Sequence, residues 1–208
     1  MIVIIQARSS SKRFPNKVLF KINKIPLILH IINRIKLSKK VKKIAVATSI
    51  DKTDDKLVYF LKKNKINYKR GSLKNVALRL YGLAKKEKVK YFLRISGDSP
   101  LIDPKIIDRA IILFSKKKNF DIITNVFPRT YPSGQSVEII KTKLLKDYLP
   151  SMNLFEKEHV TAFFYSNSKK FNIINFKNNN IRRYIKNKKL SVDVKSDIKK
   201  ILKLFAND

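Results

Sequence analysis

Several kinds of residue are absent or scarce in this chain. It has no cysteine, four glycines, and 15 acidic residues against 48 basic ones among its 208 residues. The missing cysteines exclude disulfide bonds, thiolate zinc sites and a cysteine nucleophile, and their absence suits a reducing compartment. The first apolar run, residues 1–5, is too short for a signal peptide, and no stretch approaches the roughly 20 uncharged residues that span a bilayer. We therefore expect a cytoplasmic protein without a membrane partner.

Positive charge is the most prominent feature that is present. The formal net charge is +33, which is typical of proteins that bind nucleic acid. The lysines, however, are spread over nearly every segment together with isoleucine and asparagine, residues that an AT-rich genome over-supplies. No RNP or helix-turn-helix signature accompanies them. Compositional bias on solvated faces is the favoured explanation, so we expect no nucleic-acid partner and keep nucleic-acid binding as a less favoured alternative.

Short β-rich runs alternate with longer helical patterns along the chain. Hydrophobic residues make up 44% of the sequence, enough to build a core. The expected strands are Ile2–Ile5, Lys43–Thr48, Asn67–Arg70, Tyr91–Ile95, Asp121–Asn125, Val137–Ile140, Phe171–Phe176 and Leu190–Val192. The expected helices are Leu27–Ile35, Asp51–Asn64, Val76–Glu87, Lys105–Lys117, Thr142–Leu149, Phe155–Asn167 and Ser196–Phe205. This alternation predicts a single α/β domain over residues 1–208, with a Rossmann-like, mostly parallel sheet flanked by helices.

The loop after the first strand is rich in cations. Residues 6–17 read QARSSSKRFPNK and contain Arg8, Lys12, Arg13 and Lys17 but no glycine. Ligands of open α/β sheets bind beyond the carboxyl ends of the strands, so this loop lies where phosphates bind. It matches neither glycine-rich phosphate motif, but guanidinium and ammonium groups can grip a polyphosphate without a glycine cradle. A solvated basic loop is the alternative, and the position after the first strand favours phosphate binding.

Two aspartates follow expected strands at their carboxyl ends. Asp98 follows the fourth expected strand, directly after Gly97, which we expect to allow a sharp turn, and Asp193 follows the eighth. Together the two carboxylates could hold Mg²⁺ against nucleotide phosphates, because Mg²⁺ prefers oxygen ligands and keeps several waters. Taken singly, each aspartate could equally be a turn or cap residue. Asp103 is better explained as the N-cap of the helix that follows it.

Two further polar segments could bind a ligand. Residues 125–134 (NVFPRTYPSG) carry Arg129 and Tyr131, which suit an anionic, hydroxylated ligand, although two prolines and a glycine equally describe an ordinary turn. Glu158 and His159 belong to the one dense acidic patch that contains a histidine. A lone histidine on a helix is usually structural, so a catalytic role for it is the less favoured interpretation.

These motifs, taken together, resemble the sugar cytidylyltransferase family. The closest branch is that of the SpsF-like enzymes of spore coat polysaccharide biosynthesis, and the Kdo and acylneuraminate cytidylyltransferases are similar too. The matching stretches are Q-A-R-x-x-S-x-R-x-P-x-K-x-L (Gln6–Leu19), AVATS-x-x-x-x-DD (Ala45–Asp55), RGS-x-x-x-V-x-x-R (Arg70–Arg79), RISGDSPLIDP (Arg94–Pro104), N-x-x-x-RTYP-x-G (Asn125–Gly134), EHVT (Glu158–Thr161) and SVD-x-x-x-D (Ser191–Asp197). They span nearly the whole chain, which makes the resemblance more specific than any single motif.

The resemblance implies a nucleotide-diphospho-sugar transferase fold and a Mg²⁺-dependent enzyme that transfers CMP from CTP to a sugar with release of pyrophosphate. It favours an acidic sugar destined for surface polysaccharide or glycan synthesis. The family's nucleotide-binding positions correspond to Ala7, Arg8, Ser11, Arg13, Lys17, Gly71, Ser72 and Arg79. Its metal-binding positions correspond to Asp98 and Asp193, and its sugar side to Arg129, Tyr131, Gly134, Glu138, Glu158 and His159. We expect the catalytic roles to fall to Lys17, Arg8 and Asp98.

Some alternatives stay open at this point. The main alternative is a uridylyltransferase or a glycosyltransferase of the same fold, because fold alone does not decide the reaction. The basic loop favours a nucleoside triphosphate. A sugar-side subregion over residues 126–185 could also support a homodimer, as in relatives.

Overall fold

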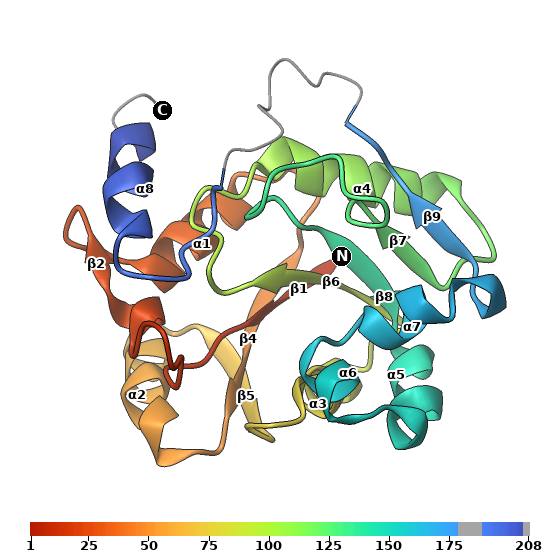
Figure 1. The fold of residues 1–208 in the computed structure, drawn as a ribbon, viewed down its shortest axis with the longest axis horizontal. Helices are drawn as coiled ribbons and strands as arrows, with labels where there is room; N and C mark the ends of the chain where they lie inside the picture. Colours follow the sequence, from red (N-terminus) through yellow and green to blue (C-terminus); the bar gives the residue numbers. More distant parts are fainter. Residues whose placement is uncertain (179–188, 206–208) are drawn as a thin grey trace.

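The computed structural model describes residues 1–178 and 189–205 and places a seven-stranded sheet at the centre of the molecule (Figure 1). The strand order is β5 (Asn67–Gly71), β4 (Lys43–Ser49), β1 (Ile2–Gln6), β6 (Tyr91–Ser96), β8 (Glu138–Lys141), β7 (Ile122–Thr124) and β9 (Ile173–Asn175). Neighbouring strands are parallel, except that β8 runs antiparallel to both β6 and β7. The predicted mostly parallel α/β sheet is therefore confirmed.

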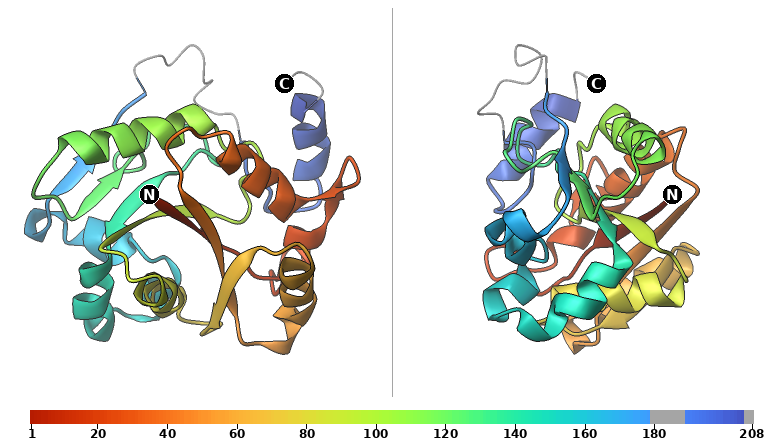
Figure 2. Two further views of the ribbon diagram at one scale, coloured as in Figure 1. Left: turned by 180° about the vertical axis from the view of Figure 1, so that it is seen from behind. Right: turned by 90° about the vertical axis from the view of Figure 1, so that its right-hand side faces the viewer.

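Helices cover both faces of this sheet (Figure 2). Val3 and Ile5 of β1 point into one core, while Ile2 and Ile4 point into the other. The first core is closed by α1 (Leu27–Lys36), α2 (Asp55–Lys63), α4 (Pro104–Lys116) and α8 (Asp197–Phe205). The second is closed by α3 (Val76–Lys86), α5 (Thr142–Tyr148) and α7 (Ala162–Ser166). Burial on both faces explains why β1 is apolar throughout rather than alternating.

Shorter elements complete the described part of the chain. Helix α6 (Leu154–Glu158) contributes no buried residue and lies beside α3. A separate two-stranded sheet pairs β2 (Lys21–Ile22) with β3 (Ile25–Pro26). The 3-10 helices are η1 (Lys17–Leu19), η2 (Lys52–Asp54), η3 (Leu149–Ser151) and η4 (Ser168–Lys170). Within residues 1–178 and 189–205, none of the helices has the length and apolar character that crossing a membrane requires.

Two predicted elements differ from the structure. Residues 155–167 do not form one helix, because His159 leaves the helical region (φ −98°, ψ 48°) and separates α6 from α7. Leu190–Val192 is not a strand, since the Val192 N–H donates to the Asp98 carbonyl at 2.8 Å instead of joining a sheet ladder. Within the proposed sugar-side subregion 126–185, residues 179–185 lie outside the described part of the chain.

The order of the strands creates a crevice beside β1. The chain builds β4 and β5 on one side of β1 and then returns to place β6 on the other side. The last residues of β1 and β6, Gln6 and Ser96, are register partners, so the loops that follow diverge from neighbouring points. Such a reversal of strand order is where open α/β sheets bind ligands.

Gly97 lies in a turn directly after β6, as the sequence predicted, and close packing at this reversal excludes a side chain there. Its backbone is not in the left-handed region. A Cβ atom added to it would lie 2.7 Å from the Gln6 carbonyl oxygen and 2.9 Å from the Ala7 Cβ. The predicted N-cap of α4 is confirmed, because an Asp103 carboxylate oxygen accepts the Lys105 N–H at 2.8 Å.

Candidate functional site

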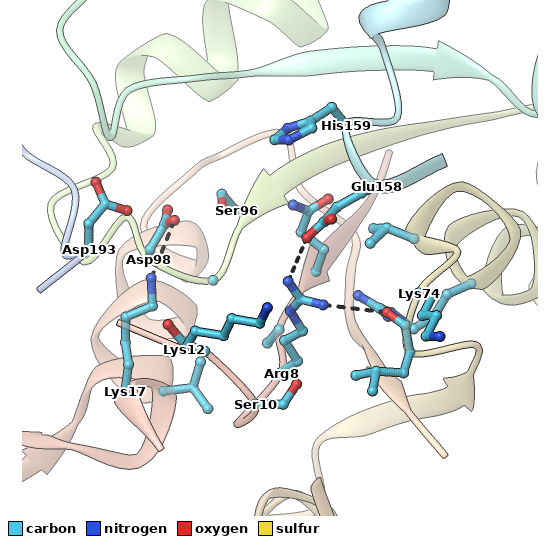
Figure 3. Close-up of a pocket in the computed structure, with 18 of the residues that line it drawn as sticks. Arg8, Ser10, Lys12, Lys17, Lys74, Ser96, Asp98, Glu158, His159 and Asp193 are labelled. Atoms are coloured by element: carbon cyan, nitrogen blue, oxygen red, sulfur yellow. Dashed lines mark hydrogen bonds and ion pairs between the residues drawn. The ribbon is translucent and has the colours of Figure 1, made fainter. Parts of the chain in front are cut away.

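A cleft of about 1050 Å³ opens at the carboxyl ends of β1 and β6 (Figure 3). Its walls come from the basic loop after β1, the start of α3, the end of β6, helix α6 and the segment around Asp193. Segments that are far apart in the sequence thus meet at the predicted ligand-binding edge of the sheet.

Asp54 holds the basic loop in place. Its side chain is fully buried, and its Oδ1 accepts the Ser9 N–H at 2.5 Å. Its Oδ2 accepts the Ser49 N–H at 3.1 Å and the Ser49 hydroxyl. Asp54 stands at the N-cap position of α2, but its side chain makes no cap hydrogen bond to that helix. Asp54 instead ties the loop after β1 to the end of β4.

Replacing Asp54 by asparagine should destabilise the protein and loosen the basic loop. An amide nitrogen would face one of the N–H donors, and a hydrogen bond to a buried charged group contributes about 1.5–3 kcal/mol. We expect the free energy of unfolding to fall by about 2–3 kcal/mol in denaturant titrations. Asp51→Asn is the control, because that aspartate is only partly buried and its side chain caps η2. Equal stabilities of the two variants would contradict this role of Asp54.

Each of three cations in the basic loop faces an acid from elsewhere in the chain. Arg8 Nη2 lies 2.6 Å from Glu158 Oε1, and Lys17 Nζ lies 3.6 Å from Asp98 Oδ2. The third pair joins Arg13 to Asp193, at 3.5 Å. Figure 3 shows the Arg8 and Lys17 pairs reaching across the cleft from the loop. A bound triphosphate would compete with these carboxylates for the same cations.

Arg79 adds a second guanidinium next to Arg8. Its Nη1 donates to the Ser72 carbonyl at 2.6 Å and to the Leu73 carbonyl at 3.3 Å, and Arg8 Nη1 lies 3.5 Å from the same Leu73 oxygen. Burial, with a further contribution from the Arg8 charge, lowers the pKa of Arg79 to about 10, so it stays protonated at neutral pH. Two like charges held this close favour an anion between them.

The remaining nucleotide-site predictions divide into two groups. Ala7 and Ser11 line the cleft. Gly71 and Ser72 lie outside its lining and instead support Arg79, because a Cβ on Gly71 would lie 3.1 Å from the Arg79 Cγ. The backbone of Gly71 and Ser72 therefore sets where the Arg79 side chain can lie.

Asp98 and Asp193 both line the cleft, and their side chains are 25% and 26% exposed. The Val192 N–H donates to the Asp98 carbonyl at 2.8 Å, which brings their segments together. Figure 3 shows the Asp98 and Asp193 side chains near each other at one end of the cleft. Among the described residues, no group of three or more potential ligands forms a closed metal cage. Two partly exposed carboxylates that line a cleft fit the chemistry of Mg²⁺, which is held by one or two carboxylates and retains waters.

Asp197 supports the Asp193 segment from behind. Its Oδ2 accepts the N–H groups of Asp193 and Val194 at 2.8 and 3.1 Å and pairs with Lys189 Nζ at 2.6 Å. Burial acts to raise the pKa of Asp197, but these hydrogen bonds outweigh it and lower the pKa below its usual value. The carboxylate therefore stays ionised and fixes the turn that carries Asp193.

The residues predicted for the sugar side are divided by the structure. Glu158 and His159 line the cleft, and the His159 ring packs 4.4 Å from the Phe155 ring. Glu138 is buried on β8, and both of its carboxylate oxygens bond to other side chains, Arg94 and Tyr165. It therefore lies behind the cleft wall.

Arg129, Tyr131 and Gly134 lie outside the cleft lining. The Tyr131 hydroxyl accepts a hydrogen bond from Arg109 at 2.8 Å, and its ring is 4% exposed. Gly134 has φ +90°, and a Cβ there would lie 2.5 Å from the Leu190 carbonyl oxygen. These residues shape the segment that packs against residues 190–191.

Sequence reasoning missed several residues that line the cleft. Gln6, Lys74, Arg94 and Ser96 were not singled out individually. Arg94 carried a usable signal, because it is a charge inside the otherwise apolar strand YFLRI. Lys74 carried none, since it is one lysine among many.

Comparison with known proteins extends the resemblance beyond the motifs. A family model described as "Cytidylyltransferase" matches residues 2–207. The spore coat polysaccharide biosynthesis protein SpsF of Bacillus subtilis (strain 168) is 30% identical over 170 residues, which cover 78% of this chain and 69% of SpsF. The 8-amino-3,8-dideoxy-manno-octulosonate cytidylyltransferase of Shewanella frigidimarina (strain NCIMB 400) is 32% identical over 167 residues, or 78% of this chain and 63% of that protein.

A solved structure agrees over the full length of the chain. A cytidylyltransferase from Leptospira borgpetersenii serovar Hardjo-bovis (strain JB197) has a TM-score of 0.90 and 28% identity, and the match covers 100% of this chain and 87% of that one. The similarity of fold therefore includes the segments between the motifs.

Proposed function

The chain belongs to the cytidylyltransferase family, and we propose that it transfers CMP from CTP to an acidic sugar, with release of pyrophosphate. An oxygen of a sugar hydroxyl bonds to the α-phosphorus of CTP. The bond from that phosphorus to the oxygen bridging the β-phosphate breaks, and pyrophosphate and a proton leave. The product, a CMP-sugar, suits the synthesis of a surface polysaccharide or glycan.

One observation supports this proposal above the others. At the reversal point of the sheet, the cations Arg8, Arg13 and Lys17 each face a carboxylate across one cleft. The cations suit a triphosphate, and the carboxylates of Asp98 and Asp193 suit Mg²⁺. A nucleoside triphosphate with its metal satisfies both sets of charges at once.

Positioning and charge neutralisation are the chain's contribution to such a transfer, because phosphoryl chemistry needs little covalent help from the protein. Arg8, Arg13 and Lys17 would neutralise the charge that grows on the departing pyrophosphate. Asp98 and Asp193 would hold Mg²⁺, which when bound polarises the α-phosphoryl group. Lys17 holds the Asp98 segment against Val192, because its Nζ also donates to the Val192 carbonyl at 2.7 Å.

The direct test measures pyrophosphate release with each nucleoside triphosphate and Mg²⁺ against a panel of sugars. The panel contains 3-deoxy-manno-octulosonate, its 8-amino-3,8-dideoxy relative, N-acetylneuraminate and neutral hexoses. We expect pyrophosphate release with CTP and a sugar acid. Release with UTP, and none with CTP for any sugar of the panel, would overturn the assignment of cytosine as the base and favour a uridylyltransferase.

Replacing Glu158 by glutamine should leave the use of CTP unchanged or improved and impair the use of the sugar. The Arg8–Glu158 pair must open before Arg8 can reach a phosphate, and half-exposed pairs contribute about 0.2–1 kcal/mol. We therefore expect the KM for CTP to stay level or fall by up to about fivefold. The kcat/KM for the sugar should fall by about 10-fold or more, because a group facing the sugar is lost.

Glu156→Gln is the matched control for this variant. Glu156 is two residues earlier on α6, where its Oε2 accepts the Asn153 N–H at 2.9 Å, and it does not line the cleft. Both parameters should stay near their wild-type values in this control. A raised KM for CTP in Glu158→Gln alone would show that Glu158 does not compete for Arg8.

A further inference from the structure

Arg94 lines the cleft and contacts both the start of the basic loop and the segment that follows Glu158 and His159. Its Nε donates to Gln6 Oε1 at 2.8 Å, next to the start of the basic loop. Its Nη1 lies 3.5 Å from Thr161 Oγ1, close in sequence to Glu158 and His159. The side chain is 15% exposed and lines the cleft. Arg94 therefore sits where the two substrates of the proposed reaction would meet.

A buried relay of side chains fixes the Arg94 guanidinium. Glu138 is the register partner of Arg94 on the neighbouring strand β8, and it accepts a hydrogen bond from Arg94 Nη1. The second oxygen of Glu138 accepts the Tyr165 hydroxyl, which also lies 2.9 Å from Thr124 Oγ1. Burial, reinforced by the charge of Glu138, raises the pKa of Tyr165 well above its usual value. Tyr165 thus remains a donor, and both carboxylate oxygens of Glu138 already accept hydrogen bonds within the relay.

A purely structural role does not explain why these charges are retained here. A buried ion pair can often be replaced by apolar residues without loss of stability, and β6 and β8 already bury Phe92 against Ile140. Within the relay, Arg94 is the member that reaches the cleft. Among the described residues its Nη2 makes no hydrogen bond, so this end of the guanidinium is available to a ligand.

We propose that Arg94 binds the carboxylate of the acidic sugar, an inference that rests on the function proposed above. A sugar acid brought beside a triphosphate meets strong repulsion between like charges, which a fixed guanidinium offsets. The planar guanidinium matches the geometry of a carboxylate, and its position is set before the sugar arrives. The relative from Shewanella frigidimarina is named for an octulosonate, a sugar that carries such a carboxylate.

The test compares wild type with Arg94→Gln, using 3-deoxy-manno-octulosonate and N-acetylneuraminate as probes. We expect the KM for the acid to rise at least about 30-fold, because one partner of a desolvated charge pair is lost. The KM for CTP should stay within about threefold, since the nucleotide contacts are intact. Arg109→Gln is the matched control, because that arginine donates to the Tyr131 hydroxyl away from the cleft and should leave both values unchanged.

A second variant guards against misfolding. Arg94→Gln leaves the Glu138 carboxylate buried without its partner, so the double variant Arg94→Gln with Glu138→Gln restores a neutral relay. Calorimetric binding of CTP checks that both variants are folded. The double variant should bind CTP normally and still bind the sugar acid weakly.

A binding measurement separates this inference from the proposed reaction. The acid is titrated calorimetrically into protein loaded with a non-hydrolysable CTP analogue, so no turnover is needed. Binding to wild type with at least about 10-fold weaker binding to the two Arg94 variants supports the inference, even if pyrophosphate release fails. Equal binding of the acid to wild type and to the variants overturns the inference. A wild-type enzyme that accepts only neutral sugars also overturns it, but leaves the proposed CMP transfer intact.

Discussion

Replacing Asp98 by alanine is expected to lower the rate of pyrophosphate release by about 10²–10³. The change removes one of the two carboxylates proposed to hold Mg²⁺ and leaves Lys17 Nζ without the anion 3.6 Å away. The rate is measured as a function of Mg²⁺ concentration. Loss of a metal ligand should raise the half-saturating Mg²⁺ concentration as well as lower the maximal rate.

Asp103→Ala is the matched control, because it removes a carboxylate from the same loop. Asp103 caps α4, and losing a cap costs about 1 kcal/mol of folding stability. This variant should unfold more easily and keep its Mg²⁺ dependence. If Asp98→Ala behaves like Asp103→Ala, with near-normal turnover, Asp98 has no place at the metal.

Much of the fold could be predicted because burial leaves a direct trace in the sequence. The unbroken apolar run of β1 reflects helices on both faces, and Pro104 after Asp103 marks the start of α4. The direction of β8 left no such trace, since the same residues would suit a strand running either way. The break at His159 was also hidden, because neither a proline nor a glycine marks it between α6 and α7.

The site was predictable where position alone indicates chemistry. Residues that follow β1 and β6 must lie at the ligand edge of the sheet, which is why Arg8, Lys17 and Asp98 were found. Asp54 and Arg94 were missed because their roles depend on burial and on partners distant in sequence. Asp54 meets Ser9 across 45 positions, and Arg94 meets Glu138 across 44.

The excess of positive charge does not by itself identify the site. With 48 basic residues, a lysine or arginine on the surface carries little information. The 15 acids carry more, and Asp98, Glu158 and Asp193 all line one cleft opposite cations. In so basic a chain, the carboxylates mark the site better than the cations do.

Replacing Lys17 by alanine is the second change expected to reduce the rate by at least about 10². Lys17 is 12% exposed, and its Nζ is held by the Val192 carbonyl as well as by Asp98. Asn16, with φ 56°, and its N–H bond to the Ser9 carbonyl at 2.8 Å bring the chain to this position. The ammonium is thus fixed before substrate binds, as neutralisation of a leaving group requires.

Two further variants identify what Lys17 does. Lys21→Ala removes an exposed lysine from β2 and should leave the rate unchanged, which excludes an effect of net charge. Lys17→Arg keeps the charge but puts a larger, planar group into a mostly buried position, so it should restore only part of the rate. A leaving-group role predicts that Lys17→Ala lowers kcat and kcat/KM together. A rise in the KM for CTP with kcat unchanged would mean that Lys17 contributes to CTP binding but not to the chemical step. Arg8 and Arg13 would then be the residues that neutralise the leaving group.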